Sequence, residues 1–359
     1  MCYILVPGPS QKLCKTVMFV AWAGCEFGPV LRHPGPSLTD ITLLESSALS
    51  ARVETARRAG AGDFRFRLMA LSAALAVLVI FAGVIGSLVI GSMPAFKAFG
   101  FGFITDEAWS PTRDHFGALA SIYGTVLTSL IALPVGIGIA IFLTDLCPRP
   151  LRRPIGIAVE LLAGIPSIIY GIWGLFVFAP WFQTHVQQPI ITSFGDNATL
   201  TFLFGDAAFG IGIFTAGLIL SIMILPFISA VTRDVLETVP SVLKEASYGL
   251  GSTSWEVMWK VCLPFCSTGV VGGAMLALGR ALGETMAVTF MIGNAHKVAP
   301  LFSPGTSISA TIANEFTEAT TPLYTASLIE LGLLLFVITF IVLACAQLML
   351  MRLERAKGK

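Results

Sequence analysis

Charged residues are scarce in this sequence. Asp, Glu, Lys and Arg together make up 12% of the 359 residues, whereas a soluble domain usually carries about 25%. The hydrophobic share is 55%, and a soluble chain could not bury that much apolar surface. This balance excludes an ordinary soluble protein and indicates that lipid surrounds most of the chain. The net charge of only +1 also argues against a nucleic-acid-binding surface.

The sequence also lacks the usual patterns of a metal site or an ATP-hydrolysing site. Its seven cysteines show no metal or redox spacing, and no pair of its four histidines has ligand spacing. No G-x-x-x-x-G-K-[ST] phosphate loop occurs anywhere in the chain. We therefore expect no metal, no cofactor and no catalytic residue, and the chain lacks the usual means of hydrolysing ATP.

Six apolar stretches are each long enough to cross about 30 Å of hydrocarbon as a helix. The first, second and fourth of them contain no charged residue. The pattern predicts an all-α membrane protein with six transmembrane helices. The six stretches are Leu68–Ile90, Ala118–Thr144, Ile155–Phe182, Phe209–Val231, Cys266–Ile292 and Tyr324–Met351.

The basic residues that flank these stretches fall mostly on one side of the membrane. From residue 52 onward, fifteen lysines and arginines lie before the first stretch, between the second and third, between the fourth and fifth, or after the sixth. Only three lie in the other loops. Because loops rich in Lys and Arg stay in the cytoplasm, we expect both termini to be cytoplasmic.

The beginning of the chain differs in character from the rest. Lys12 is followed by an apolar run, Val17–Ala23, and by Cys25, which weakly imitates a signal peptide. Cleavage there would place the following arginine cluster outside, against the charge bias. We expect residues 1–60 to form a disordered or mis-started extension, with a short interfacial helix as the alternative. Residues 61–355 would form the six-helix membrane domain.

A long cytoplasmic loop, residues 232–264, separates the fourth and fifth stretches and predicts two short helices. Pro240 suits the first turn of one helix. Thr253 and Glu256 have the spacing of a capping box for the next. Pro264 is expected to separate that helix from the fifth membrane span. From the residues alone, an amphipathic linker on the membrane surface explains the loop as well as a docking segment does.

The same loop contains a motif made of Glu245, Ala246, Ser247, Gly251, Leu263 and Pro264. This motif resembles the "EAA" loop of ABC importer permeases, with Ser247 where the family has Ala, a small-for-small change. In that family the loop forms a coupling helix that docks on an ATPase subunit, so the resemblance implies a type I ABC importer permease fold. It also implies that Glu245 caps or orients the helix and that Gly251 allows a sharp turn.

The fifth stretch contains two opposite charges, Arg280 and Glu284. A charge at the bilayer centre costs about 2.5–3.5 kcal/mol on insertion scales, so such residues pair or face a wet path. Four residues apart on one helix, the two side chains can meet. Two readings remain open: an ion pair that locks helix packing, or an arginine that meets a translocating oxyanion while the glutamate holds it in place. An arginine suits an oxyanion because its planar guanidinium matches the geometry of the anion and is always charged.

Four further stretches carry a second resemblance: Phe116–Leu119, Ile122–Thr125, Gly164–Gly171 and Gly279–Asn294. They resemble the PstC-type family of phosphate permeases, and the resemblance covers roughly residues 60 to 355 and not the first 50. In this family the residues that match Arg280 and Glu284 are implicated in phosphate passage, and we carry over these two as the expected substrate path.

The resemblance implies a multi-pass inner-membrane permease of an ATP-driven phosphate importer, not itself an enzyme. The implied partners are a second permease of the PstA type, two ATPase subunits of the PstB type and a periplasmic phosphate-binding protein of the PstS type. The alternative is a permease for another tetrahedral oxyanion, sulfate or molybdate.

Three further residues inside the membrane stretches predict structure rather than chemistry. Glu160 and Glu330 are single acids, for which we expect packing roles through a neighbouring helix. Pro166 should kink the third span.

Overall fold

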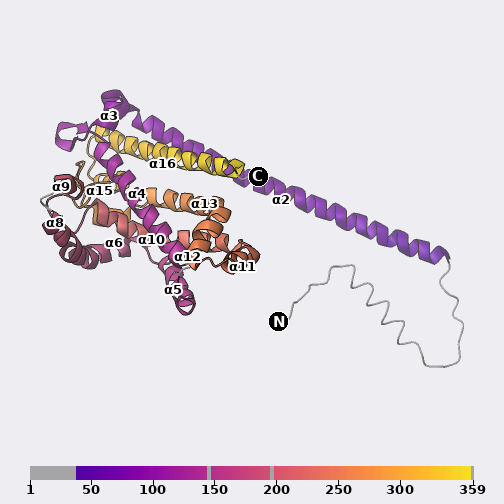
Figure 1. Ribbon diagram of the computed structural model, residues 1–359. Coiled ribbons are helices and arrows are strands. Elements are labelled where there is room, and N and C mark those ends of the chain that lie inside the picture. Colours follow the sequence, from indigo (N-terminus) through magenta and orange to yellow (C-terminus); the bar gives the residue numbers. More distant parts are fainter. Residues whose placement is uncertain (1–37, 144–146, 195–197, 357–359) are drawn as a thin grey trace. The chain divides into compact units, whose positions relative to one another are not determined.

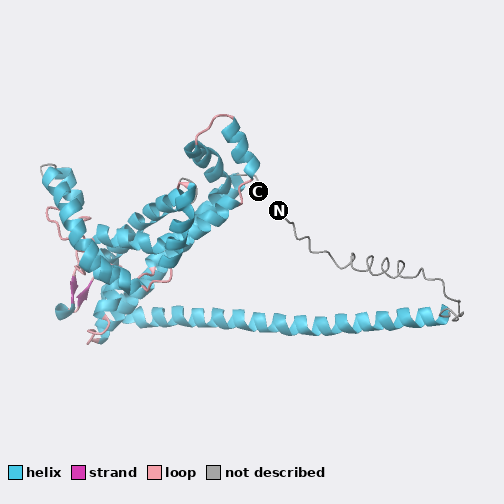
Figure 2. Ribbon diagram, turned by 90° about the horizontal axis from the view of Figure 1, so that it is seen from below, coloured by secondary structure: helices cyan, strands magenta, loops and turns pink. Residues whose placement is uncertain are grey.

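The computed structural model describes residues 38–143, 147–194 and 198–356. The chain divides into two units, Met1–Leu78 and Val79–Lys359. Figures 1 and 2 show that the described chain is almost entirely helical.

The described part of the first unit is the beginning of helix α2, which runs from Leu38 to Phe99. We expected disorder up to residue 60, and residues 1–37 lie outside the described residues. From Leu38 to residue 60 the structure has helix, as in the alternative that we gave, and the domain boundary at residue 60 stays a prediction. The physical reason is local, because this stretch contains no proline and is rich in Leu, Ala, Glu and Arg, which favour helix.

Five helices in the described residues are long and apolar enough to cross a membrane, or six if one bent pair is counted as a single span. Their positions confirm the six predicted spans. The single helices are Phe64–Phe99 within α2, α4 (Leu119–Ile141), α10 (Ile213–Glu237), Ser254–Leu282, which ends with α13 (Leu263–Leu282), and Pro322–Arg352 within α16 (Pro322–Ala356).

The third span is the bent pair. Its first half, α5 (Arg149–Leu162), and the helices that follow from Ser167 meet at an angle of 101°. Pro166 lies at the break with an extended ψ of 138°, which confirms the predicted kink; the backbone bends far more than a kinked helix does. The segment after the break consists of α6 (Ser167–Trp173), η3 (Gly174–Phe178), α7 (Ala179–Phe182), η4 (Gln183–Gln187), α8 (Gln188–Phe194) and α9 (Ala198–Phe204).

Helix α10 lies at the centre of the second unit, against α4, α13 and the short helix α14 (Met286–Ile292). Most of its apolar side chains are fully buried, among them Ile219, Leu220 and Ile224. They form the main hydrophobic cluster together with residues of α4, α6 and α14. This cluster fixes the positions of the helices that carry the polar residues discussed below.

Helix α4 also makes a very close backbone contact. A methyl group on Gly124 would collide with the carbonyl oxygen of Thr306. Ser121 and Thr125 on the same face hydrogen-bond to Thr311 and to the N–H of Ile308. Only glycine leaves room for the backbone to pass this close to the helix.

The end of the unit opposite the cytoplasmic loop carries a small hairpin and an aromatic cluster. Strands β1 (Trp109–Ser110) and β2 (His115–Phe116) pair antiparallel around η1 (Pro111–Arg113), with Trp109 opposite Phe116. Phe116 and Tyr324 stack with ring centroids 4.9 Å apart. Helices α3 (Gly102–Thr105) and α15 (Ile308–Glu315) complete this end.

Candidate functional site

The fifth membrane span is interrupted. We expected one helix through Ile292, but α13 ends at Leu282 and α14 begins at Met286. Gly283 caps α13, and Thr285 has φ −111° and ψ −61°. Glycine and a β-branched residue both weaken a helix. The break places the Gly-Glu-Thr motif in irregular backbone, which proteins tolerate at membrane depth only where it is buried or lines a wet cavity.

Arg280 lies in the last turn of α13 and its side chain is exposed in this chain. Its guanidinium carbon is 4.6 Å from the ring centroid of Phe227 in α10, within the range of a cation–π contact. Phe227 is ten residues, or about 15 Å, from the last residue of α10, Glu237. Phe227 is also fourteen residues from the first residue of α10, Ile213, so the arginine lies beside the middle part of this membrane helix.

Glu284 lies in the break between the two helices. Its backbone N–H donates to the carbonyl of Ala281 at 3.3 Å, and its own carbonyl accepts from the hydroxyl of Ser309 at 2.8 Å. Among the described residues there is no ion pair between Glu284 and Arg280. The expected contact four residues apart requires an unbroken helix, and the helix ends before Glu284. The structure therefore does not have the ion pair of the packing interpretation, and the role of the two residues stays a prediction.

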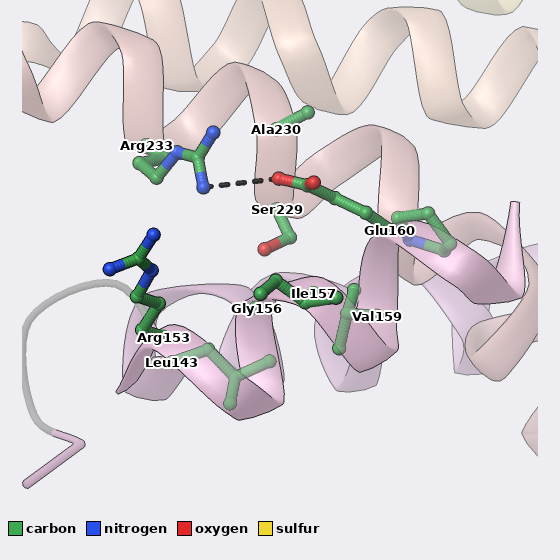
Figure 3. A pocket seen from close by; sticks show the side chains of 10 residues that line it. Leu143, Arg153, Gly156, Ile157, Val159, Glu160, Ser229, Ala230 and Arg233 are labelled. Atoms are coloured by element: carbon green, nitrogen blue, oxygen red, sulfur yellow. Dashed lines mark ion pairs between the residues drawn. The ribbon is translucent and has the colours of Figure 1, made fainter. Parts of the chain in front are cut away.

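A cavity of about 490 Å³ opens between α5 and α10, closer to the cytoplasmic end of α10 than Arg280. Glu160 of α5 and Arg233 of α10 form an ion pair across it, with Oε1 and Nη1 3.1 Å apart. Arg153, two turns before Glu160 on α5, also lines the cavity. Figure 3 shows both guanidinium groups directed toward the same space. The expected contact of Glu160 with a neighbouring helix is thus confirmed.

Glu330 is the other acid inside a predicted span. It lies in α16, with only 6% of its surface exposed. One of its carboxyl oxygens, Oε2, has no hydrogen-bond partner among the described residues. Its packing role stays a prediction.

The cytoplasmic loop presents an exposed apolar surface on helix α11 (Ser241–Gly249) and the turns that follow it. No residue of α11 is buried. Val242 is 70% exposed and Leu250 is 88% exposed. The side chains of Trp255 and Trp259 are also about half exposed. So much apolar surface on a cytoplasmic segment is typical of a protein-docking site.

The turn after α11 is built by Gly251, as predicted. Gly251 has φ +87° and donates its N–H to the carbonyl of Tyr248. The N–H of Ser252 donates to the carbonyl of Ser247. These two bonds form a Schellman motif, which requires a left-handed residue at this position. The N-cap of α11 is Pro240.

The remaining residues of the EAA-like motif lie on or beside this surface. Glu245 and Ala246 are exposed in the middle of α11, where Glu245 caps neither end. Ser247 and Leu263 are half-buried, and Pro264 is exposed.

The second short helix is α12 (Ser254–Val257), and its capping box is present. The hydroxyl of Thr253 accepts from the N–H of Glu256 at 3.3 Å, and the Glu256 carboxylate accepts from the N–H of Thr253 at 3.0 Å. Val257 is buried in a cluster with Leu236, from the end of α10, and Val239, two residues after that helix ends. The loop is therefore anchored to the membrane helices while its outer face stays exposed.

Pro264 does not separate the loop from the fifth span. Residues Ser254–Leu282 form one helix, in which η5 (Met258–Cys262) is a π turn just before the proline. Proline lacks an N–H and its ring crowds the carbonyl four residues earlier. A wider π turn removes that clash, so the helix continues where we expected it to end.

The chain matches the family model "Binding-protein-dependent transport system inner membrane component" over residues 132–355. It is 60% identical over 314 residues to the "Phosphate transport system permease protein PstC" of Mesorhizobium japonicum, covering 86% of this chain and 96% of the relative. The chain belongs to the PstC permeases of this family. The protein of the same name from Pasteurella multocida is 56% identical over 302 residues, covering 83% of this chain and 94% of that relative.

A solved structure shares the fold of this PstC-family chain. The crystal structure of a bacterial alginate ABC transporter, in complex with its pentasaccharide-bound periplasmic protein, contains a chain that matches with a TM-score of 0.52. The match covers 79% of this chain and 94% of that one at 18% identity, so it supports the fold alone. The type I permease fold expected from the EAA-like motif is confirmed.

As a PstC-family permease, the chain is an inner-membrane component of an ABC transporter and works with ATPase and binding-protein partners. It is not itself the catalytic subunit.

Sequence reasoning missed the cavity between α5 and α10. We used Arg153 and Arg233 only as charges that fix orientation, and Glu160 only as a packing acid. One signal was available: Arg153 and Glu160 are seven residues apart, two helical turns, and so share a face of α5. Nothing in the sequence indicated that Arg233 of α10 would complete the group.

Proposed function

We propose that this chain is the permease subunit of an ATP-driven importer of inorganic phosphate, with Arg280 and Glu284 on the substrate path. The observation that carries the proposal is the position of Arg280: an exposed cation beside the middle part of α10, at the end of an interrupted membrane helix. A permanently charged fork at that depth matches the geometry of a tetrahedral oxyanion. The resemblance of the chain to the PstC permeases supports phosphate as that anion.

The end of α13 keeps the anion from binding too tightly. The carbonyl end of a helix carries a partial negative charge of about half an electron, and Arg280 lies in this last turn. This charge partly offsets the attraction between Arg280 and an arriving anion. Contact with Phe227 also occupies one face of the guanidinium. Modest affinity is what transport requires, since an anion held tightly at mid-depth would not leave.

Glu284 has a different role from the one expected for an ion-paired partner. Its backbone is fixed in the break by the bond from Ser309, and its side chain is half-buried. We place it beside the path as a fixed negative charge. There it screens Arg280 and limits how long a dianion stays.

Coupling to ATP hydrolysis runs through α11. The partners are a second permease of the PstA type, two ATPases of the PstB type and a phosphate-binding protein of the PstS type. The loaded binding protein docks outside, and closure of the ATPases displaces α11. Because α12 and α13 form one helix with the π turn, that displacement reaches Arg280 and changes its access from one side to the other.

The test is uptake of radiolabelled phosphate by cells that carry Arg280→Gln, with membrane expression measured in parallel. We expect uptake to fall at least tenfold while assembly with the ATPase stays normal. Arg355→Gln, which removes an exposed cytoplasmic-side charge at the end of α16, is the matched control. Unchanged uptake by Arg280→Gln would reduce the arginine to a structural residue. Competition by sulfate and molybdate in the same assay separates phosphate from the alternative oxyanions.

A further inference from the structure

The cavity between α5 and α10 holds more positive than negative charge. Arg153 and Arg233 line it together with a single acid, Glu160. In the described part of the chain, the ion pair that Glu160 forms is with Arg233, through one oxygen and one nitrogen. Among the described residues Arg153 makes no ion pair. The lining described here therefore holds two guanidinium groups and one carboxylate, a formal charge of +1.

The geometry also leaves space for a ligand. At about 490 Å³ the cavity falls within the range of about 300–1,000 Å³ that is common for small-molecule sites. The hydroxyl of Ser229 is directed into the same space as the two guanidinium groups (Figure 3). The site thus offers two guanidinium groups and a hydroxyl, which are groups that bind the oxygens of a phosphate or a related oxyanion.

The existing ion pair is of a kind that an anion can displace. The side chain of Arg233 is 46% exposed and that of Glu160 is 56% exposed. Pairs this exposed contribute about 0–1 kcal/mol. The pair keeps Arg233 oriented when the cavity is empty, and an incoming dianion replaces the carboxylate with little loss.

The cavity lies on the cytoplasmic side of Arg280. Phe227, which contacts Arg280, and Arg233 are both on α10, six residues or about 9 Å apart along the helix. Arg233 is only four residues from the end of α10 at Glu237. The exposed face of α10 between them includes Ala230, which also lines the cavity. An anion that leaves Arg280 toward the cytoplasm therefore meets this group next.

We propose that Arg153 and Arg233 form a second oxyanion-binding site at the cytoplasmic end of the permease, with Glu160 as its displaceable counter-ion. The site takes a phosphate-type oxyanion, and the inference that this anion is the transported one rests on the proposed function. A second cationic binding site shortens the distance that a desolvated anion must cross without a positively charged partner. It also lets phosphate on the cytoplasmic side rebind and slow the cycle.

The same chemistry admits a phospholipid headgroup as the source of the oxyanion. Arginines at the cytoplasmic boundary of a membrane protein attract anionic lipids. The experiment below separates a soluble phosphate from a lipid headgroup.

The test uses the complete transporter in liposomes, with its ATPases facing outward and binding protein with labelled phosphate inside. Release of label is started with external ATP, and unlabelled phosphate is titrated outside. We expect external phosphate to inhibit release. Glu160→Gln should lower the half-inhibitory phosphate concentration about fivefold, and Arg153→Gln should raise it about fivefold, which is the effect of one exposed charge. Arg355→Gln should match the unmodified protein.

The lipid arm repeats the titration in phosphatidylcholine with and without phosphatidylglycerol. In phosphatidylcholine alone, a lower half-inhibitory phosphate concentration for Glu160→Gln and a higher one for Arg153→Gln support a site for soluble phosphate. If only phosphatidylglycerol changes the rate, and Arg153→Gln removes that change, the site binds a lipid headgroup. If neither phosphate nor lipid distinguishes Arg153→Gln and Glu160→Gln from Arg355→Gln, there is no oxyanion site in the cavity.

Arg280→Gln, measured in the same preparation, keeps this inference separate from the proposed function. Normal release by Arg280→Gln would overturn the path role of Arg280 whatever the cavity variants do. Loss of release by Arg280→Gln, with no shift in the cavity variants, would leave the proposed function standing and remove the second site.

Discussion

Replacing Gly251 with alanine should weaken the docking of the ATPase through backbone strain alone. Gly251 has φ +87°, and a methyl group placed there would meet no atom within 4 Å. No contact is gained or lost, so the only cost is that of a left-handed conformation for a residue with a side chain, about 1–2 kcal/mol. If the variant loop relaxes to another turn when it is free and docking requires the original turn, this cost appears in docking. The dissociation constant of the ATPase then rises by up to about five- to thirtyfold, at 1.4 kcal/mol for each factor of ten.

Gly249 provides the matched control two residues earlier. A methyl group there also meets nothing within 4 Å, but its φ is not positive. Gly249→Ala at the end of α11 should leave docking unchanged or slightly stronger, because alanine favours helix by up to about 1 kcal/mol over glycine.

The assay is titration of detergent-solubilised permease complex with labelled ATPase subunit, followed by transport-coupled ATP hydrolysis. Equal dissociation constants for Gly251→Ala and the unmodified protein would refute the reasoning that the Schellman turn shapes the docking surface. Equal weakening by Gly249→Ala and Gly251→Ala would refute the reasoning from φ. A loss confined to Gly251→Ala confirms it.

Two further predictions concern stability. Gly124→Ala should destabilise the protein by about 1–3 kcal/mol, the usual cost of overpacking, because its methyl group collides with the carbonyl of Thr306; Gly138→Ala on the same helix, where a methyl group has open space, should show no loss in a thermal-shift assay. Burial lowers the pKa of His296, while the charge of Glu315 opposes this in part. The folded protein therefore binds this proton less readily than the unfolded chain, so stability should be full above pH 6.5, the ordinary value, and decline as the pH falls below it. His296→Gln should reduce the difference between melting temperatures at pH 7.5 and pH 5.5, and an unchanged difference would assign the pH effect to other groups.

The sequence was sufficient for the features that depend on composition and local chemistry. Hydropathy located the six spans because each must bury its backbone polar groups in a helix. The capping box at Thr253 and the turn at Gly251 were predictable because each involves residues within one turn of the chain. The bend at Pro166 was predictable in place, but not in its angle of 101°, which is set by the packing of α6 against α14.

The interruption of the fifth span was not predictable in the same way. Glycine occurs inside many unbroken helices, and here the break is supported by a distant residue, since Ser309 donates to the carbonyl of Glu284. The error at Pro264 has a related cause. A proline usually ends a helix, and whether a π turn accommodates it depends on the burial of Met258 and Cys262 against the end of α10. Periodicity carries no information about such contacts.

The continuity of Ser254–Leu282 limits where mechanical work can be delivered. A helix of 29 residues is about 43 Å long and stiff over that length. A displacement of its cytosolic end is transmitted along the continuous helix to Arg280. The helix ends two residues later, at Leu282, where the backbone is interrupted before α14. Beyond the break, α14 packs against α6, α10 and α15. Because the backbone is interrupted between Leu282 and Met286, a displacement of α13 can move Arg280 without an equal displacement of α14.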